Sequence, residues 1–373
     1  MTIDIFPTLH FLARPGLTPG LLTLTRSGAA TRMGPRGLVE AVDADTLRHD
    51  YDAASGVYLG WLIEESRTNL LLHARDQSGA PWTRSNLTAA RSAVGADGVA
   101  AAACTLTATL AGAAVYQPVT AASATYTLSV DLRRAAGTGP VSLTLDGGAS
   151  WFAVAAAALR SDRYSRVTLS QTLANPTPGL KLAVAGDAVA ADYWQLEAGS
   201  FATSRIPTAS APVTRGADLA RLDPAGSWFN PDEGTVYVDA IPHPVATGVK
   251  TLFSSSDSPD AVEFSVGAHA QGVQTNIGAI GSGFSGGSPS GRPVAPGAAV
   301  RVALAYGPAG GVVVQDGAVF QGFGTGTRWD TTGLAIGHQL RGGAQRWLNG
   351  HVRHVAVFPR RLADAQATDL TTF

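Results

Sequence analysis

The chain of 373 residues is long enough for two or three domains, and its 45% of hydrophobic residues can fill their cores. A formal net charge of −1 provides no basic field for nucleic acid or an anionic membrane, and a single cysteine, Cys104, excludes an intrachain disulfide. The 43 glycines and 21 prolines exclude a fold built from long helices.

Residues 1–75 contain few clean strands and carry chain breakers such as "RPGLTPG" and "RMGPRG". They predict a small irregular N-terminal segment. The first residues lack the charged and continuous apolar regions of a secretory signal, so we expect no export signal. In the most apolar stretch, residues 99–116, threonines alternate with leucine or alanine. This period of two predicts a strand and no membrane insertion.

From residue 76 onwards, apolar and polar residues alternate in many short segments, as in "ATYTLSVDLRR" (124–134) and "VRVALAY" (300–306). The Asp316-Gly317 pair in "VVVQDGAVF" predicts a tight hairpin turn. Together these patterns predict an all-β fold class with two antiparallel β-sandwich (jelly-roll) domains. The expected divisions are the N-terminal segment 1–75, a first sandwich 76–207, a linker 208–218 and a second sandwich 219–373.

The C-terminal stretch from residue 334 to 370 reads as the closing edge of the second sandwich. Asn349-Gly350 is a strong turn former. Val352, Val355 and Val357 share an inward phase only if the strand bulges at Arg353-His354. We expect Pro359 to end the strand and "LADAQATDL" to form a short capping helix.

Catalytic and metal-binding patterns are weak throughout the chain. His351 and His354 are three residues apart and have no third ligand nearby, which argues against a metal ion. The glycines of "GSGFSG" (281–286) precede no helix, so they predict a loop and not a dinucleotide site. A hydrolase on such a sandwich would need two carboxylates on one sheet face, which on a strand means a spacing of two. Asp43 and Asp45 have that spacing but lie in the irregular N-terminal segment. The other candidates lack it: Glu64/Glu65 are adjacent, Asp232/Glu233 lie in a turn before a strand, and Asp257/Asp260/Glu263 span a loop. For Glu64 and Glu65, an ion pair with Arg67 is the plainer interpretation.

No cofactor is expected. A Ca²⁺ ion at Asp257 and Asp260 is an alternative to a solvated turn there, because that ion accepts oxygen ligands without rigid geometry.

Two tryptophans lie in Gly-rich segments that are not continuous strands: Trp329 in "GTGTRWDTTG" and Trp347 in "GGAQRWLNG". Exposed aromatic rings stack on the apolar faces of sugars, while polar neighbours bind the hydroxyls. We therefore predict a glycan-binding site at Trp329, Trp347, Arg341 and Asp330. The alternative is that both rings pack under their own loops. The other tryptophans weighed are expected in the core, namely Trp82, Trp151, Trp194 and Trp228.

Two long segments resemble signature sequences of a known family: "RHDYDAASGVYLGWLIEESRTNLLLHARDQSGAPWTRSN" (48–86) and "YWQLEAGSFATSRIPTASAPVTRGAD" (193–218). They are similar to head-spike and tail-fibre proteins of tailed bacteriophages and gene transfer agents. In that group the two segments flank a carbohydrate-binding-module-like jelly roll, and a laminin-G or concanavalin A-like domain follows. The departures are Ser66 for alanine, Arg205 for an aromatic residue, and Arg353-His354 for an acidic pair.

The resemblance implies a virion surface protein without enzymatic activity that attaches to host envelope glycans, either capsule or lipopolysaccharide. Residues 1–75 would attach to the particle and oligomerise. The implied partners are bacterial surface polysaccharide, other capsid or tail proteins, and further copies of the chain; nucleic acid is not among them. The implied location is the virion surface, after assembly in the bacterial cytoplasm. The alternatives are a polysaccharide depolymerase on the same fibre and a purely structural decoration protein.

Overall fold

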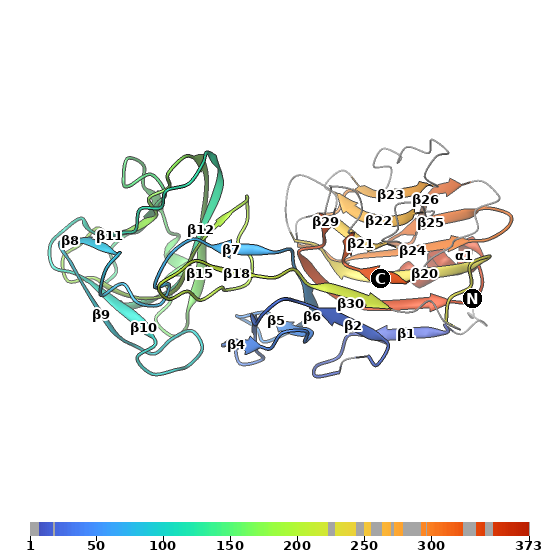
Figure 1. Cartoon of the computed structure of the whole chain (residues 1–373), viewed down its shortest axis with the longest axis horizontal. Coiled ribbons are helices and arrows are strands. Elements are labelled where there is room, and N and C mark those ends of the chain that lie inside the picture. The colour runs from blue at the N-terminus through green and yellow to red at the C-terminus, as the bar shows by residue number, and fades with distance from the viewer. Residues whose placement is uncertain are drawn as a thin grey trace. The chain divides into compact units, whose positions relative to one another are not determined.

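The computed structural model describes residues 7–17, 19–222, 228–243, 250–254, 263–269, 272–278, 292–295, 297–323, 333–339 and 346–372. The chain divides into two compact units, and Figure 1 labels many of their strands. Unit 1 consists of Met1–Gly28, Val42–Glu65 and Ala217–Phe373, and unit 2 of Ala29–Ala41 and Ser66–Gly216. Each unit is built from antiparallel sheets around its own core, so the all-β prediction is confirmed.

The larger sheet of unit 1 has eight strands. Its order is β26 (Ala318–Phe323), β25 (Gly311–Gln315), β24 (Val300–Tyr306), β20 (Gly234–Ile241), β30 (Gly350–Phe358), β6 (Tyr58–Ile63) and β5 (Arg48–Tyr51), with β1 (Leu9–Leu12) also paired to β30. Helix α1 (Asp364–Thr371) covers part of one face, where Leu362 and Ala367 are buried against it.

The second sheet of unit 1 has six strands. Its order is β2 (Leu22–Thr25), β19 (Leu219–Leu222), β27 (Leu334–Ile336), β21 (Lys250–Ser254), β22 (Glu263–His269) and β23 (Gly272–Gly278). β28 (His338–Gln339) and β29 (Arg346–Trp347) form a separate short pair. One apolar core joins the two larger sheets, with Val238 and Val302 from one and Leu222 and Phe253 from the other.

Unit 2 is a sandwich of two five-stranded sheets. One sheet, called sheet F, runs β15 (Ser165–Leu173), β12 (Ala124–Ala136), β17 (Ala188–Ala198), β10 (Ala103–Ala108) and β9 (Leu87–Ala93). The other, called sheet E, runs β14 (Phe152–Ala153), β13 (Val141–Thr144), β16 (Gly179–Leu182), β11 (Ala113–Tyr116) and β8 (Thr83–Ser85). Smaller elements are the pair β7 (Arg67–Asn69) and β18 (Val213–Arg215), the hairpin β3 (Ala30–Met33) and β4 (Val39–Val42), and the 3-10 helix η1 (Ala156–Ala158).

The apolar residues of the alternating segments lie in the cores, as the sequence predicted. Tyr126, Leu128, Val130 and Leu132 of β12 are buried in unit 2. The stretch 99–116 supplies β10 and β11, as its period of two predicted. The described part of the chain contains no helix with the length and apolarity needed to cross a bilayer.

The local predictions near the C-terminus are confirmed as well. Asp239 pairs with His354 and Ala240 with Val352, so Arg353 is the extra residue of a bulge in β30. Asp316 and Gly317 have φ angles of +46° and +75°, as the tight turn between β25 and β26 requires.

The N-terminal segment differs from the expectation. Residues 1–75 do not stand apart, because β1, β2, β5 and β6 complete the sheets of unit 1, and Trp61 on β6 is 1% exposed in its core. The expected linker 208–218 contains β18, which pairs with β7. These short strands are stabilised by partners far away in sequence, and local periodicity does not reveal such pairing.

Candidate functional site

The predicted glycan-binding residues are only partly described by the structure. Trp329, Asp330 and Arg341 lie outside the described residues, and their role stays a prediction. Trp347 is described: it is 6% exposed, packs in the core of unit 1, and donates from Nε1 to the Asp218 carbonyl oxygen at 3.3 Å. A ring in this position has no open face for a sugar. The Gly-rich sequence before it predicted a loop, whereas the chain enters β29 at Arg346.

The two histidines that were weighed for metal binding have other partners. His351 Nε2 lies 2.8 Å from Asp50 Oδ2, and the His354 ring packs edge-on against Tyr237 and His10. Burial lowers the pKa of His354 to about 4, so this ring is neutral at physiological pH. Asp257 and Asp260 lie outside the described residues. Among those described, no group of three or more potential protein ligands is gathered for a metal.

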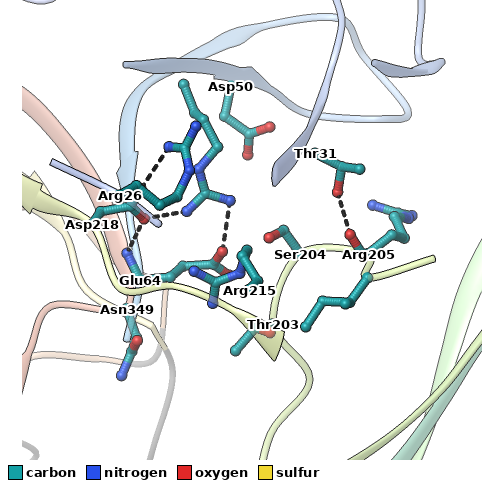
Figure 2. Close-up of polar contacts among 12 residues, drawn as sticks. Arg26, Thr31, Asp50, Glu64, Thr203, Ser204, Arg205, Arg215, Asp218 and Asn349 are labelled. Atoms are coloured by element: carbon teal, nitrogen blue, oxygen red, sulfur yellow. Dashed lines mark hydrogen bonds and ion pairs between the residues drawn. The ribbon is translucent and has the colours of Figure 1, made fainter. Parts of the chain in front are cut away.

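A buried ion cluster in unit 1 accounts for one of the carboxylates that were weighed (Figure 2). Arg26 donates to Asp218 Oδ1 at 2.9 Å, and Arg48 donates to Glu64 Oε2 at 2.8 Å and also to Asp218. The Glu64 backbone N–H donates to Asp218 Oδ2 at 2.8 Å. These guanidinium groups neutralise the carboxylates away from solvent, so the cluster joins the N-terminal strands to the start of β19 and is structural. Glu64 therefore has a partner, Arg48, that the sequence interpretation did not identify.

The second signature segment forms a strap, defined here as residues 199–206, over the outer face of sheet F. Arg205 binds both carboxylate oxygens of Asp131 on β12, at 2.7 and 2.8 Å. Thr203 donates to Glu197 on β17, and the Ile206 backbone N–H donates to Gln195 at 2.6 Å. Thr31 donates to the Arg205 carbonyl oxygen, as Figure 2 shows. The motif residues thus fix the strap to the sheet.

The first signature segment has a matching structural role at Asn69. Its side-chain amide donates to the carbonyl oxygens of Trp194 and Ile206, at 2.9 and 2.8 Å. Its Oδ1 accepts from the backbone N–H groups of Leu71 and Leu196. Asn69 is 0% exposed and connects β17, the end of the strap and its own strand.

The outer face of sheet E presents a different arrangement, built by strand register. Gly179 on β16 pairs with Thr144 on one side and with Tyr116 on the other. Cross-strand partners share a face, so Tyr116 points outward, opposite to the core residue Val115. Trp151 directly precedes β14, whose Phe152 pairs with Leu143. Alternation along the chain brings the indole to the same face as Tyr116.

Three side chains on this face form what we call the aromatic platform: Tyr116, Trp151 and Lys181. The ring centroids of Tyr116 and Trp151 are 6.0 Å apart, and Lys181 Nζ lies 4.5 Å from the centroid of the Trp151 ring. All three side chains are half-buried, so each keeps exposed surface. A Cβ on Gly179 would lie 2.5 Å from Tyr116 Cδ1 and 2.7 Å from the Val115 carbonyl oxygen. Glycine at this position therefore leaves room for the tyrosine ring.

The loop that carries Trp151 is held by its own hydrogen bonds. Asp146 Oδ1 accepts from the Thr144 hydroxyl at 2.7 Å and from the Ser150 backbone N–H at 2.9 Å. Gly148, with φ +95°, donates from its backbone N–H to the Thr144 hydroxyl oxygen at 3.0 Å. Burial acts to raise the pKa of Asp146, but hydrogen bonds from Ser150 and Thr144 outweigh it and lower the pKa, so the carboxylate stays ionised.

The polar tips of the platform are available to a ligand. Within the described residues, the Trp151 Nε1–H, the Tyr116 hydroxyl and the Lys181 ammonium have no hydrogen-bond or ion-pair partner. In contrast, Trp82 in the core of the same unit donates from Nε1 to the Leu72 carbonyl oxygen at 3.1 Å. Burial raises the pKa of Tyr116, so its hydroxyl remains protonated and able to donate near neutral pH.

The sequence analysis did not identify this site, because Trp151 was expected in the core. Trp82, Trp194 and Trp228 are buried as expected, whereas Trp151 is half-buried on the outer face. One signal was present: Lys181 lies between Leu180 and Leu182, which marks the solvent-facing phase of that strand. That Trp151 and Tyr116 meet beside it depends on the pairing of β16 with β11 and β13.

No protein family model matches the chain, and no curated protein matches it by sequence. Three solved structures are similar to part of the chain. The CBM40 module of the Ruminococcus gnavus IT-sialidase bound to α2,3-sialyllactose is 13% identical, covers 38% of this chain and 83% of its own chain, and has a TM-score of 0.33. The Trypanosoma rangeli sialidase with 2,3-difluorosialic acid is 18% identical, with 41% of this chain and 25% of its own covered and a TM-score of 0.34. Domain 4 of AbnA, a GH43 extracellular arabinanase from Geobacillus stearothermophilus, with arabinotriose, is 17% identical, with 47% of this chain and 82% of its own covered and a TM-score of 0.34. At these scores the likeness is confined to part of the fold, and the function has to be argued from the residues of this chain.

Proposed function

We propose that the chain is a glycan-binding protein of a virion surface, without catalytic activity, and that the aromatic platform of unit 2 is its sugar site. The observation that carries the proposal is the pairing of two half-buried aromatic rings, 6.0 Å apart, with polar tips that no described residue uses. Aromatic rings bind the C–H faces of sugars, and nearby donors bind the hydroxyls. The site lies in unit 2, whereas the glycan-binding residues predicted from the sequence belong to the second sandwich, 219–373.

The virion part of the proposal is supported by the two signature-like segments, 48–86 and 193–218. In the sequence they flank most of the strands of the sandwich that carries the platform. A shallow site of this kind binds each sugar weakly, and many copies on one particle would compensate through avidity. The partners proposed are bacterial surface polysaccharide, other capsid or tail proteins, and further copies of the chain. The protein would be assembled in the bacterial cytoplasm and displayed on the particle.

The sugar site is tested by binding of the purified full chain to immobilised capsule and lipopolysaccharide. Trp151→Ala should weaken binding about tenfold or more, because it removes the main stacking surface. Tyr51→Ala is the matched control, since Tyr51 is a half-buried tyrosine in unit 1 whose ring lies 5.2 Å from that of Tyr58. Equal binding by both variants and the unaltered chain would refute the platform as the site.

The absence of catalysis is tested by incubating the protein with the glycan that it binds and measuring reducing ends over time. No increase is expected beyond the glycan alone. Sustained release of oligosaccharide would favour the depolymerase alternative. Antibody labelling of particles tests the location, and particles that carry no label would contradict a virion surface protein.

A further inference from the structure

Lys181 gives the aromatic platform a charged member. The chain has 27 lysines and arginines, of which only Lys181 and Lys250 are lysines. The buried Arg48 and the partly buried Arg205 bind carboxylates through the planar guanidinium. Lys181 is instead half-buried at the surface, and its ammonium meets no carboxylate among the residues that the structure describes.

The neighbours of Lys181 leave its charge available. On sheet E it pairs with Ser142 on one side and Ala114 on the other, and neither residue is charged. The acid of the adjoining loop, Asp146, already accepts hydrogen bonds from Thr144 and Ser150. The Trp151 ring beneath the ammonium holds it near the stacking surface by a cation–π contact but does not neutralise it.

We propose that the platform selects sugars that carry an anionic group, a carboxylate or a phosphate, and that Lys181 binds this group while Trp151 and Tyr116 stack on the ring. This inference rests on the proposed function and specifies its ligand class. The low-dielectric ring surface beside the ammonium strengthens its attraction for an anion compared with a lysine surrounded by water. The Trp151 Nε1–H and the Tyr116 hydroxyl supply two further donors for ring hydroxyls.

The test uses a panel of purified bacterial polysaccharides, each with a matched neutral form. Carboxyl reduction converts uronic acids to neutral sugars on the same backbone, and mild hydrofluoric acid removes phosphate, so the two treatments distinguish the two sources of charge. The unaltered chain should bind an anionic member, and the corresponding treatment should weaken binding about fivefold or more. Added salt should weaken binding to the anionic form and leave the neutral form nearly unchanged.

Variants assign this effect to Lys181. Lys181→Gln should lower affinity for the anionic glycan by about the same factor as removing the charge from the glycan, and Lys181→Arg should restore most of it. Lys181→Gln should lower affinity for the neutral form by a smaller factor than for the anionic form, because the neutral form lacks the group that the ammonium binds. Glycan binding that is indifferent to charge removal and to Lys181→Gln would overturn this inference while leaving the platform as a sugar site. A chain that binds no member of the panel would overturn the proposed function and this inference together.

Discussion

On one outer face of the unit 2 sandwich, the strap covers sheet F. Its side-chain and backbone groups pair with Asp131, Gln195 and Glu197, which are 1%, 0% and 0% exposed. On the other outer face, sheet E carries Trp151, Tyr116 and Lys181, whose polar tips are unpaired within the described structure. The first face gains stability from hydrogen bonds shielded from water. The second keeps donors and apolar surface in contact with solvent. The difference shows where a partner of this chain is to be sought.

Asn69→Ala should produce the largest loss of stability. It removes the amide that serves four backbone groups around the strap, and leaves them unpaired away from water. We expect the free energy of unfolding of unit 2 to fall by about 3 kcal/mol. The measurement is urea-induced unfolding of the full chain, with Thr68→Ala on the same strand as control. If the two variants unfold at the same urea concentration, the strap face is not held as described.

Gly179→Ala should have an intermediate effect on stability and also affect binding. The added methyl group would meet the Tyr116 ring and the Val115 carbonyl oxygen, and shifting them costs about 1–3 kcal/mol. Glycan affinity should fall because Tyr116 is displaced. Gly79→Ala is the control, since a Cβ there has no heavy atom within 4 Å. Unchanged melting temperature and affinity in Gly179→Ala would show that the rings do not need this close approach.

The smallest effect concerns pH and the loop that holds Trp151. The folded-state pKa of Asp146 lies below its ordinary value of 3.8, so its hydrogen bonds are fully formed above that pH and are lost as the pH falls through the folded-state pKa. Glycan binding should therefore be constant from neutral pH to about pH 4 and weaken only as the pH falls through the folded-state pKa.

Asp146→Asn should remove part of this acid sensitivity and weaken binding by a few-fold at every pH, because an amide replaces the ionised acceptor. Asp162→Asn serves as control, since Asp162 pairs with Arg160 on an exposed segment. If glycan affinity falls identically at low pH in Asp146→Asn and in the unaltered chain, the ionisation of Asp146 does not control binding at the platform.

Much of the local structure could be predicted from the residues alone. The alternating phases of β12 and β24, the turn at Asp316-Gly317 and the bulge at Arg353 follow from side-chain period and turn chemistry, which act between near neighbours in sequence. The placement of tryptophans was less predictable. Trp347 was expected in a loop and is buried, and Trp151 was expected in the core and is half-buried at the surface.

The sequence by itself determined an all-β chain with two sandwich cores, because a period of two and frequent turn residues leave few other ways to bury so much apolar surface. Only the tertiary structure decided that N-terminal strands complete the sheets of unit 1, that the strap seals one face of unit 2, and that Tyr116, Trp151 and Lys181 meet on the other. These outcomes depend on pairings between residues far apart in the chain. The free energy of such pairings comes from partners that a local pattern does not contain.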